Sequence, residues 1–185
     1  SYIGGIAGYA AVKTTTGCAN SGTISVHSRG LVYVGGVAGY YMGSLMSGCR
    51  NSAMILVDSQ AGADVGGIGG LCQTDETSYC FNSGRIQLSL MDDAVTTTLS
   101  AFNTFMAGGI WGNSISSNIV IHQSANTGDI SVNVNHSNKR GSKAFAGGIL
   151  GCDRNHNSNA VTQINDCYNL GDVTASSSPI TVRMA

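Results

Sequence analysis

Few side chains in this chain of 185 residues have the spacing that catalysis or metal binding requires. The histidines are His27, His122, His136 and His156. None of them belongs to an HExxH pair, which zinc peptidases use, and we interpret them as solvated polar side chains. No CxxC pair and no GxSxG nucleophile motif occurs either. The sequence therefore predicts no metal site, no cofactor and no catalytic residue.

Carboxylates offer the best remaining case for an enzyme, because a glycoside hydrolase needs two of them across a groove. The candidates are Asp75, Glu76, Asp92 and Asp93, which lie in or near one long segment. We favour an interpretation of these four as solvated loop charges. Asp92 and Asp93 are kept as candidate ligand-binding residues.

Trp111, the only tryptophan, is the third candidate ligand-binding residue. Its ring could stack on a sugar at the surface. Alternatively, it could pack beneath the segment 89–104 together with Phe102 and Phe105. We favour packing.

The cysteines have a spacing that indicates structure more than chemistry. They are Cys18, Cys49, Cys72, Cys80, Cys152 and Cys167. An even number allows a disulfide framework. However, Cys18, Cys49 and Cys80 are 31 residues apart, and Ser124 fills the equivalent position farther along the chain. This pattern favours a ladder of small, buried side chains with free thiols.

The interval of 31 residues is the period of an internal repeat. Its first half is a glycine-rich apolar run of the form Gly-Gly-(Ile/Val)-x-Gly. Copies begin at residues 4, 35, 66, 108 and 147. The first two steps are identical and the last two are longer. Each run sits in an apolar context, without the strand, helix and acidic residue that a nucleotide-binding glycine loop needs.

The second half of the repeat centres on an asparagine. The copies are Asn20, Asn51, Asn82, Asn126 and Asn169. Four of the five are followed two residues later by glycine, and the exception is Ala53. Asparagine bonds its own backbone in turns. Stacked rungs would also let the side-chain amides pass hydrogen bonds along an asparagine ladder.

Alternating apolar residues after each asparagine predict a strand that repeats in every copy. Two aliphatic columns are expected, one of Ile24, Ile55, Ile86, Ile130 and Val173 and one of Ile6, Val37, Ile68, Ile110 and Ile149. In one copy the expected strands are Tyr33–Tyr40, Leu45–Arg50 and Met54–Asp58. The predicted fold is all-β: a right-handed parallel β-helix (β-solenoid) of about five rungs, with three short strands per 31-residue repeat.

We expect one domain over residues 1–185, cut from a longer surface protein. Its repeats span about residues 2–32, 33–63, 64–105, 106–144 and 145–175. The period is broken near residues 89–104, 133–144 and 153–160. Such insertions usually form loops on one face of a solenoid, often the binding face.

Composition excludes several classes of partner. Charged residues make up only 10% of the chain, the net charge is −1, and 26 residues are glycine. There is no basic surface for nucleic acid and no run of about 18 apolar residues that would span a membrane. The low charge also argues against disorder.

The paired motif Gly-Gly-(Ile/Val)-x-Gly followed by Cys-x-Asn-x-Gly-x-(Ile/Val) resembles the GLUG repeat of bacterial cell-surface and secreted proteins. The resemblance covers all five copies, from Tyr2 to Ala175. The fourth copy departs from it at Trp111 and Ser124. The resemblance implies an extracellular or cell-surface location in a bacterium, with further domains in the same chain.

The expected function is that of a non-catalytic structural or adhesive module that presents loops to a glycan or protein. The partner would be a host or microbial glycan or surface protein. One alternative is a fragment of a carbohydrate-active β-helix enzyme. Another is an accessory, non-catalytic region of a large surface peptidase.

Overall fold

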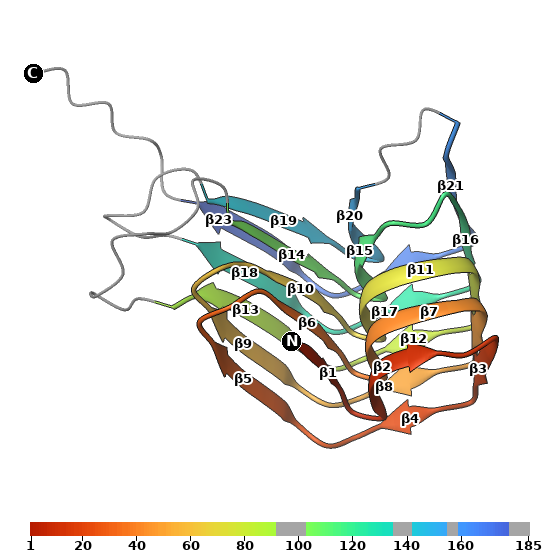
Figure 1. The fold of residues 1–185 in the computed structure, drawn as a ribbon, viewed down its shortest axis with the longest axis horizontal. Coiled ribbons are helices and arrows are strands. Elements are labelled where there is room, and N and C mark those ends of the chain that lie inside the picture. Colours follow the sequence, from red (N-terminus) through yellow and green to blue (C-terminus); the bar gives the residue numbers. More distant parts are fainter. Residues whose placement is uncertain (92–102, 135–141, 155–158, 178–185) are drawn as a thin grey trace, which may run out of the picture.

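A computed structural model shows an all-β chain whose strands pair in parallel with the strands one repeat away (Figure 1). It describes residues 1–91, 103–134, 142–154 and 159–177. The strands stack into four parallel sheets over five rungs, which confirms the predicted parallel β-solenoid. Among the described residues, no helix is long and apolar enough to cross a bilayer.

Each rung contributes a strand to each of the four sheets. Sheet 1 contains β1 (Tyr2–Gly4), β6 (Val32–Gly35), β10 (Ala63–Gly66), β14 (Thr104–Gly108) and β19 (Lys143–Gly147). Sheet 2 contains β2 (Ala7–Ala11), β7 (Ala38–Ser47), β11 (Gly69–Ser78), β15 (Trp111–Ser114) and β20 (Leu150–Asp153), together with β3 (Thr14–Thr16), β16 (Asn118–His122) and β21 (Val161–Asn165).

The other two sheets follow the asparagine half of the repeat. Sheet 3 contains the two-residue strands β4 (Ala19–Asn20), β8 (Arg50–Asn51), β12 (Phe81–Asn82), β17 (Ala125–Asn126) and β22 (Tyr168–Asn169). Sheet 4 contains β5 (Ile24–Ser28), β9 (Ile55–Ser59), β13 (Ile86–Leu90), β18 (Ile130–Val134) and β23 (Val173–Ser177).

A bend at the Gly-Gly pair gives the rung four sheets where three strands were expected. The predicted strand Tyr33–Tyr40 is interrupted at Gly36 and Val37, between β6 and β7. A Cβ on Gly36 would meet the carbonyl oxygen of Gly67 in the next rung, and would lie 2.7 Å from the Cβ of Asn51. Only glycine leaves room for this bend, and the bend moves the chain into a new sheet.

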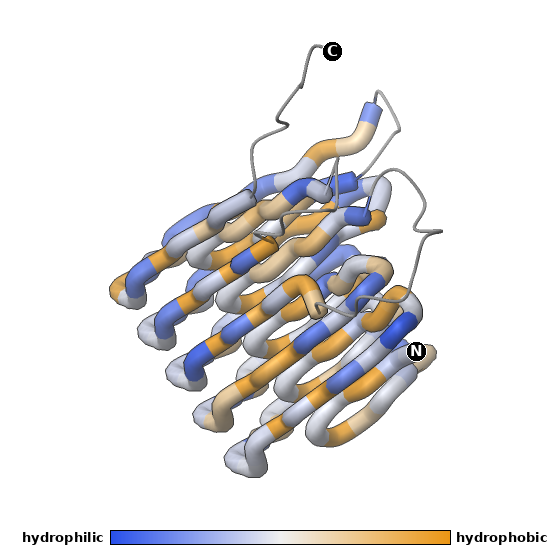
Figure 2. The backbone as a smooth tube through the Cα atoms, turned by 90° about the vertical axis from the view of Figure 1, so that its left-hand side faces the viewer, coloured by the Kyte–Doolittle hydropathy of each residue, from blue (hydrophilic) through white to orange (hydrophobic). Residues whose placement is uncertain are grey.

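The register confirms both predicted columns. Ile55 pairs with Ile24 on one side and with Ile86 on the other, and the series continues through Ile130 to Val173. The second column, which includes Val37 and Ile68, lies at the Gly-Gly bend. Backbone hydrogen bonds between successive rungs hold it, such as the one from the Val37 amide to the Ile68 carbonyl at 2.8 Å. Figure 2 shows hydrophobic residues recurring at the same place in successive rungs.

The interior is divided into two apolar cores. One lies between sheets 1 and 4 and includes Val34, Ile86 and Phe105. The other lies inside the long strands of sheet 2 and includes Tyr41 and Trp111. Side chains that alternate along each strand point into a core or outward. The outward side chains of sheets 1 and 2 form the candidate site described below.

In every rung, the turn that precedes the sheet 3 strand has a left-handed backbone. The five residues are Gly17, Gly48, Tyr79, Gln123 and Asp166, with φ between 48° and 64°. Only two of these positions carry glycine, so the pattern is not visible in the sequence. The turn immediately precedes the position of Cys18 and its equivalents, and it fixes the direction in which sheet 3 begins.

Candidate functional site

Trp111 is a core residue and not a surface platform for a sugar. Its side chain is fully buried, and its indole Nε1 donates a hydrogen bond to Thr77 Oγ1 at 2.9 Å. Its ring stacks on Tyr41 with centroids 6.2 Å apart. In the neighbouring rung Gly69 has no Cβ, and the indole ring occupies the space that a side chain there would need.

The alternative that Trp111 packs is therefore correct, although Phe105 is not its partner. Phe105 belongs to the other core, between sheets 1 and 4. Phe102 lies outside the described residues, as do Asp92 and Asp93. The sequence showed the unusual residue but not which face of β15 it occupies.

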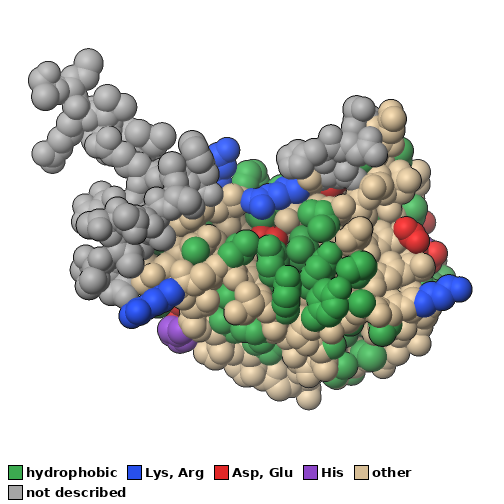
Figure 3. Space-filling view, viewed as in Figure 1, with side chains coloured by type: hydrophobic (Ala, Val, Ile, Leu, Met, Phe, Trp, Pro, Cys, Tyr) green, Lys and Arg blue, Asp and Glu red, His purple; other side chains and the backbone are tan. Residues whose placement is uncertain are grey.

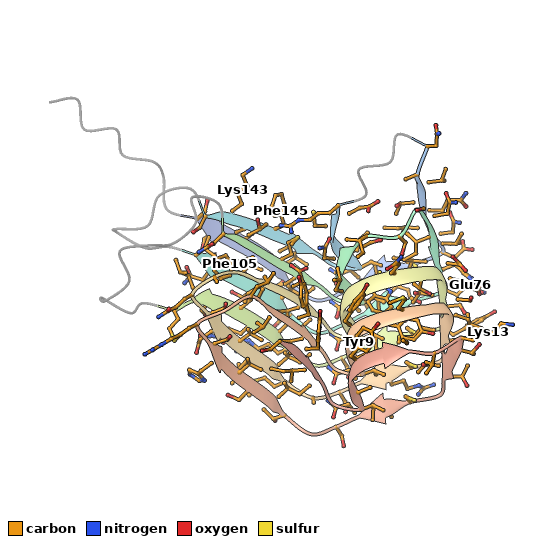
Figure 4. All side chains as sticks on the ribbon, in the orientation of Figure 1. Tyr9, Lys13, Glu76, Phe105, Lys143 and Phe145 are labelled. Carbon is orange, nitrogen blue, oxygen red and sulfur yellow. The ribbon has the colours of Figure 1, made fainter. Side chains whose placement is uncertain are left out.

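The remaining predicted carboxylates do not form a catalytic pair. Glu76 lies on β11 of sheet 2, on the right-hand side of the molecule in Figure 4. Its Oε1 is 3.0 Å from His122 Nε2. Asp75 is exposed beside it on the same strand. Within the four described ranges, no group of three His, Cys, Asp or Glu residues could hold a metal ion.

The predicted asparagine ladder is present in full. Side-chain amides connect Asn20, Asn51, Asn82, Asn126 and Asn169 through Nδ2-to-Oδ1 hydrogen bonds of 2.9, 2.8, 2.7 and 2.7 Å. Each asparagine Nδ2 also donates to the carbonyl oxygen two residues later. These residues are structural. In the middle rungs, the side-chain amides of the ladder asparagines are all hydrogen-bonded within the stack.

The six cysteines are free thiols, and Cys18, Cys49 and Cys80 contact one another in a column, as their spacing indicated. The backbone amide of Cys80 donates to Ser124 Oγ at 3.1 Å, which places Ser124 in the same column. A hydrogen bond with Cys49 and burial both raise the pKa of Cys80. Burial also raises the pKa of Cys72 to about 12. Thiols with raised pKa values are poor nucleophiles at neutral pH.

A concave surface forms where sheets 1 and 2 meet at the Gly-Gly bends, and we name it the notch. Its walls are two columns of outward side chains. Sheet 1 contributes Tyr2, Tyr33, Asp64, Met106 and Phe145, and sheet 2 contributes Tyr9, Tyr40, Leu71, Asn113 and Cys152. Figure 3 shows hydrophobic side chains gathered between the two limbs of the fold. Tyr9 and Phe145, labelled in Figure 4, belong to the first and last rungs.

Glycines at the base of the notch allow its two walls to approach closely. A Cβ on Gly39 would lie 2.8 Å from the carbonyl oxygen of Ile3, on the opposite wall. A Cβ on Gly70 would lie 2.5 Å from the amide nitrogen of Val34. The third glycine of the repeat motif is therefore required by the notch, because any side chain there would separate the two sheets.

Four tyrosines cover the first two rungs of the notch. The Tyr2 ring lies 5.4 Å from Tyr33, 5.6 Å from Tyr40 and 5.7 Å from Tyr9, measured between centroids. Tyr9 and Tyr40 are 5.2 Å apart, edge to face. Tyr2 and Tyr9 are each 48% exposed. The result is a continuous aromatic surface built from both walls and open to solvent.

The third and fourth rungs fill the notch with buried side chains. Leu71 and Met106 pack there. Between them, Asn113 Nδ2 donates to Asp64 Oδ2 at 2.9 Å, and both residues are almost fully buried. Burial raises the pKa of Asp64 to about 6, while the Asn113 hydrogen bond and the charge of Arg154 act in the opposite direction. Asp64 thus joins the two walls at the centre of the notch.

Aromatic and apolar side chains make up most of the two columns of the notch. Asp64 is the only carboxylate in its two columns, so those columns lack the second carboxylate that glycoside hydrolysis requires. The tyrosines were not identified as site residues from the sequence. Their signal was nonetheless present, because Tyr2 and Tyr33, like Tyr9 and Tyr40, are one period apart.

Comparison with known proteins gives no relative from which a function could be transferred. The chain matches no family model, no curated protein sequence and no solved structure.

Proposed function

We propose that this chain is a non-catalytic adhesive module of a bacterial cell-surface or secreted protein, and that the notch binds a glycan. The observation that carries the proposal is the cluster of four tyrosine rings on the open part of the notch. Rigid side chains on a stacked β scaffold form a preorganised surface, which lowers the entropic cost of binding.

Tyrosine rings suit a sugar because both partners are amphipathic. A sugar ring presents C–H bonds on one face, which pack on an aromatic ring, and hydroxyl groups around its edge. The tyrosine hydroxyls supply hydrogen-bonding groups at the rim of the surface. One of them, on Tyr40, already donates to Gln73 Oε1 at 3.1 Å. The low charge of the chain favours a neutral glycan over a polyanion.

The resemblance to GLUG repeats supports the cellular context of the proposal. Arrays of this kind accompany other domains in surface and secreted proteins, and they are not themselves catalytic. The notch offers a way in which such a module would hold a glycan for a neighbouring domain. An accessory role beside a surface peptidase fits the same surface, since it also needs binding without catalysis.

A glycan array tests this proposal with four proteins: the wild type, Tyr2→Ala, Tyr9→Ala and Tyr168→Ala. Tyr168 is 54% exposed but lies on sheet 3, away from the notch, and serves as the matched control. We expect the wild type and Tyr168→Ala to bind the same neutral glycans. The notch variants should lose about fivefold in affinity, because an aromatic contact contributes on the order of 1 kcal/mol.

Two results would contradict the proposal. One is that the wild type binds no glycan on the array. The other is that Tyr168→Ala weakens binding as much as Tyr9→Ala does. Circular dichroism of each variant shows that a loss of binding does not reflect a loss of folding.

A further inference from the structure

Two buried oxygen atoms in the notch accept no hydrogen bond within the part of the chain that the structure describes. They are Asp64 Oδ1 and Asn113 Oδ1. The other polar atoms of the same two side chains are paired, because Asn113 Nδ2 donates to Asp64 Oδ2 at 2.9 Å. A buried acceptor without a donor destabilises the fold, so two of them in one contact need an explanation.

We propose that Asp64 in the folded protein keeps a proton in mildly acidic solution, where an ordinary aspartate has lost it, and that this proton locks the two walls of the notch together. The protonated Asp64 Oδ1 donates to Asn113 Oδ1, while Asn113 Nδ2 donates to Asp64 Oδ2. The two side chains then form a closed pair with two reciprocal hydrogen bonds. One proton satisfies both unpaired oxygens, and no charge is buried.

The surroundings of the pair favour the neutral acid. Asp64 lies on β10, between Tyr33 of β6 and Met106 of β14, and it faces Asn113 and Leu71 across the notch. The titratable and charged groups around it are Tyr2, Tyr33, Tyr40, Cys152, Asp153 and Arg154.

None of these neighbours replaces the proton on Asp64. Burial raises the pKa values of Tyr33, Tyr40 and Cys152, so these groups stay neutral through the range in which a carboxyl titrates. Asp153 accepts a hydrogen bond from Thr162 Oγ1 on the outer part of sheet 2. Arg154 acts on Asp64 through its charge, but among the described residues no ion pair includes the Asp64 carboxyl.

The lock has a defined dependence on pH. The pKa of Asp64 is about 6 in the fold, against about 4 for an aspartate in an unfolded chain. Between these values the folded protein keeps a proton that the unfolded chain has released, so stability is highest at low pH. As pH rises from about 4 to above 6, the unfolding equilibrium constant should increase by up to about 100-fold, and it should then level off. This inference does not depend on whether the notch binds a glycan.

Chemical denaturation from pH 4 to pH 8 tests the lock in the wild type, Asp64→Asn and Asp75→Asn. An asparagine at 64 can form the same two hydrogen bonds without a proton, so Asp64→Asn should lack this pH dependence. Asp75 is exposed on sheet 2, and its variant should keep the wild-type profile. The inference is overturned when the wild type and Asp64→Asn change equally with pH.

A second measurement does not rely on any variant. The carboxyl carbon of Asp64 in uniformly labelled wild-type protein can be followed by NMR across the same pH range. We expect a midpoint near pH 6. A midpoint near pH 4 or below would show that the fold does not hold the proton on Asp64 beyond the ordinary range of an aspartate, and would overturn the inference even if Asp64→Asn does not fold.

Discussion

Asn82 shows how a single residue serves both its own turn and the stack. Its Nδ2 donates to the Gly84 carbonyl at 2.9 Å and to Asn126 Oδ1 at 2.7 Å. Its Oδ1 accepts from the Gly84 amide and from Asn51 Nδ2. No other side chain of similar size offers two donors and an acceptor in this arrangement. The repeated asparagine is therefore explained by structure alone.

The position of each asparagine in the stack should set its contribution to stability. Asn82→Ala removes two ladder bonds in a buried environment and leaves Asn51 and Asn126 with unpaired groups. We expect a loss of about 2–4 kcal/mol in the free energy of unfolding. Asn169→Ala, in the exposed last rung, should cost less than about 1.5 kcal/mol. Urea denaturation measures both, and equal losses would show that the ladder does not act through burial.

Residue types alone predicted some roles and missed others. The asparagine and cysteine columns were correctly expected because their period is regular and stacking follows from it. Trp111 was a misleading candidate, because its rarity does not show which face of the strand it occupies. Nothing in the sequence marked Asp64 as a candidate site residue. Its importance comes from Asn113, which is 49 residues away and meets it only across the notch.

The bend at the Gly-Gly pair is the element that sets the shape of each rung. The apolar run on both sides reads as one strand, so the sequence predicted three strands where the chain forms four sheets. What breaks the run is contact with the next rung. For example, a Cβ on Gly67 would meet the Gly109 carbonyl oxygen and the side chain of Asn82. A single copy of the motif cannot reveal that contact.

Two glycine substitutions compare the stability contribution of a glycine at the bend with that of a glycine in an ordinary turn. Gly67→Ala places a methyl group against a backbone carbonyl and a ladder asparagine, neither of which can move without disturbing the next rung. We expect it to cost at least about 3 kcal/mol or to prevent folding. Gly30→Ala meets no atom within 4 Å and should change stability by less than about 0.5 kcal/mol. Thermal unfolding followed by circular dichroism distinguishes the two. Tolerance of Gly67→Ala would contradict the role given to the bend.

At the scale of the whole molecule, five similar rungs produce a surface that no single rung possesses. The 31-residue period predicted the solenoid, its columns of aliphatic, asparagine and cysteine side chains, and the stacking of its rungs. The notch results from the angle between sheets 1 and 2 and from the side chains that each rung adds to it. Tyrosines occupy the first two rungs and a buried polar pair joins the third to the fourth, so the site varies along a regular scaffold.

Binding was expected at the loops that interrupt the period, whereas the notch is formed by residues of the regular rungs. The sequence directed attention to the interruptions of the period, and residues 92–102, 135–141 and 155–158 within them lie outside the described parts. The structure directs attention to positions where the period holds but the side chain is aromatic and exposed. Tyr2 and Tyr9 belong to a regular rung and are still half exposed.

The most direct test of the notch as a glycan-binding surface observes the tyrosines themselves. The chain has seven tyrosines, and selective ring labelling lets each NMR signal be followed while a glycan identified on the array is added. We predict that the signals of Tyr2, Tyr9, Tyr33 and Tyr40 shift together. The signals of Tyr41, Tyr79 and Tyr168 should stay in place. Shifts confined to the latter three, or an unchanged spectrum at a saturating glycan concentration, would contradict the account.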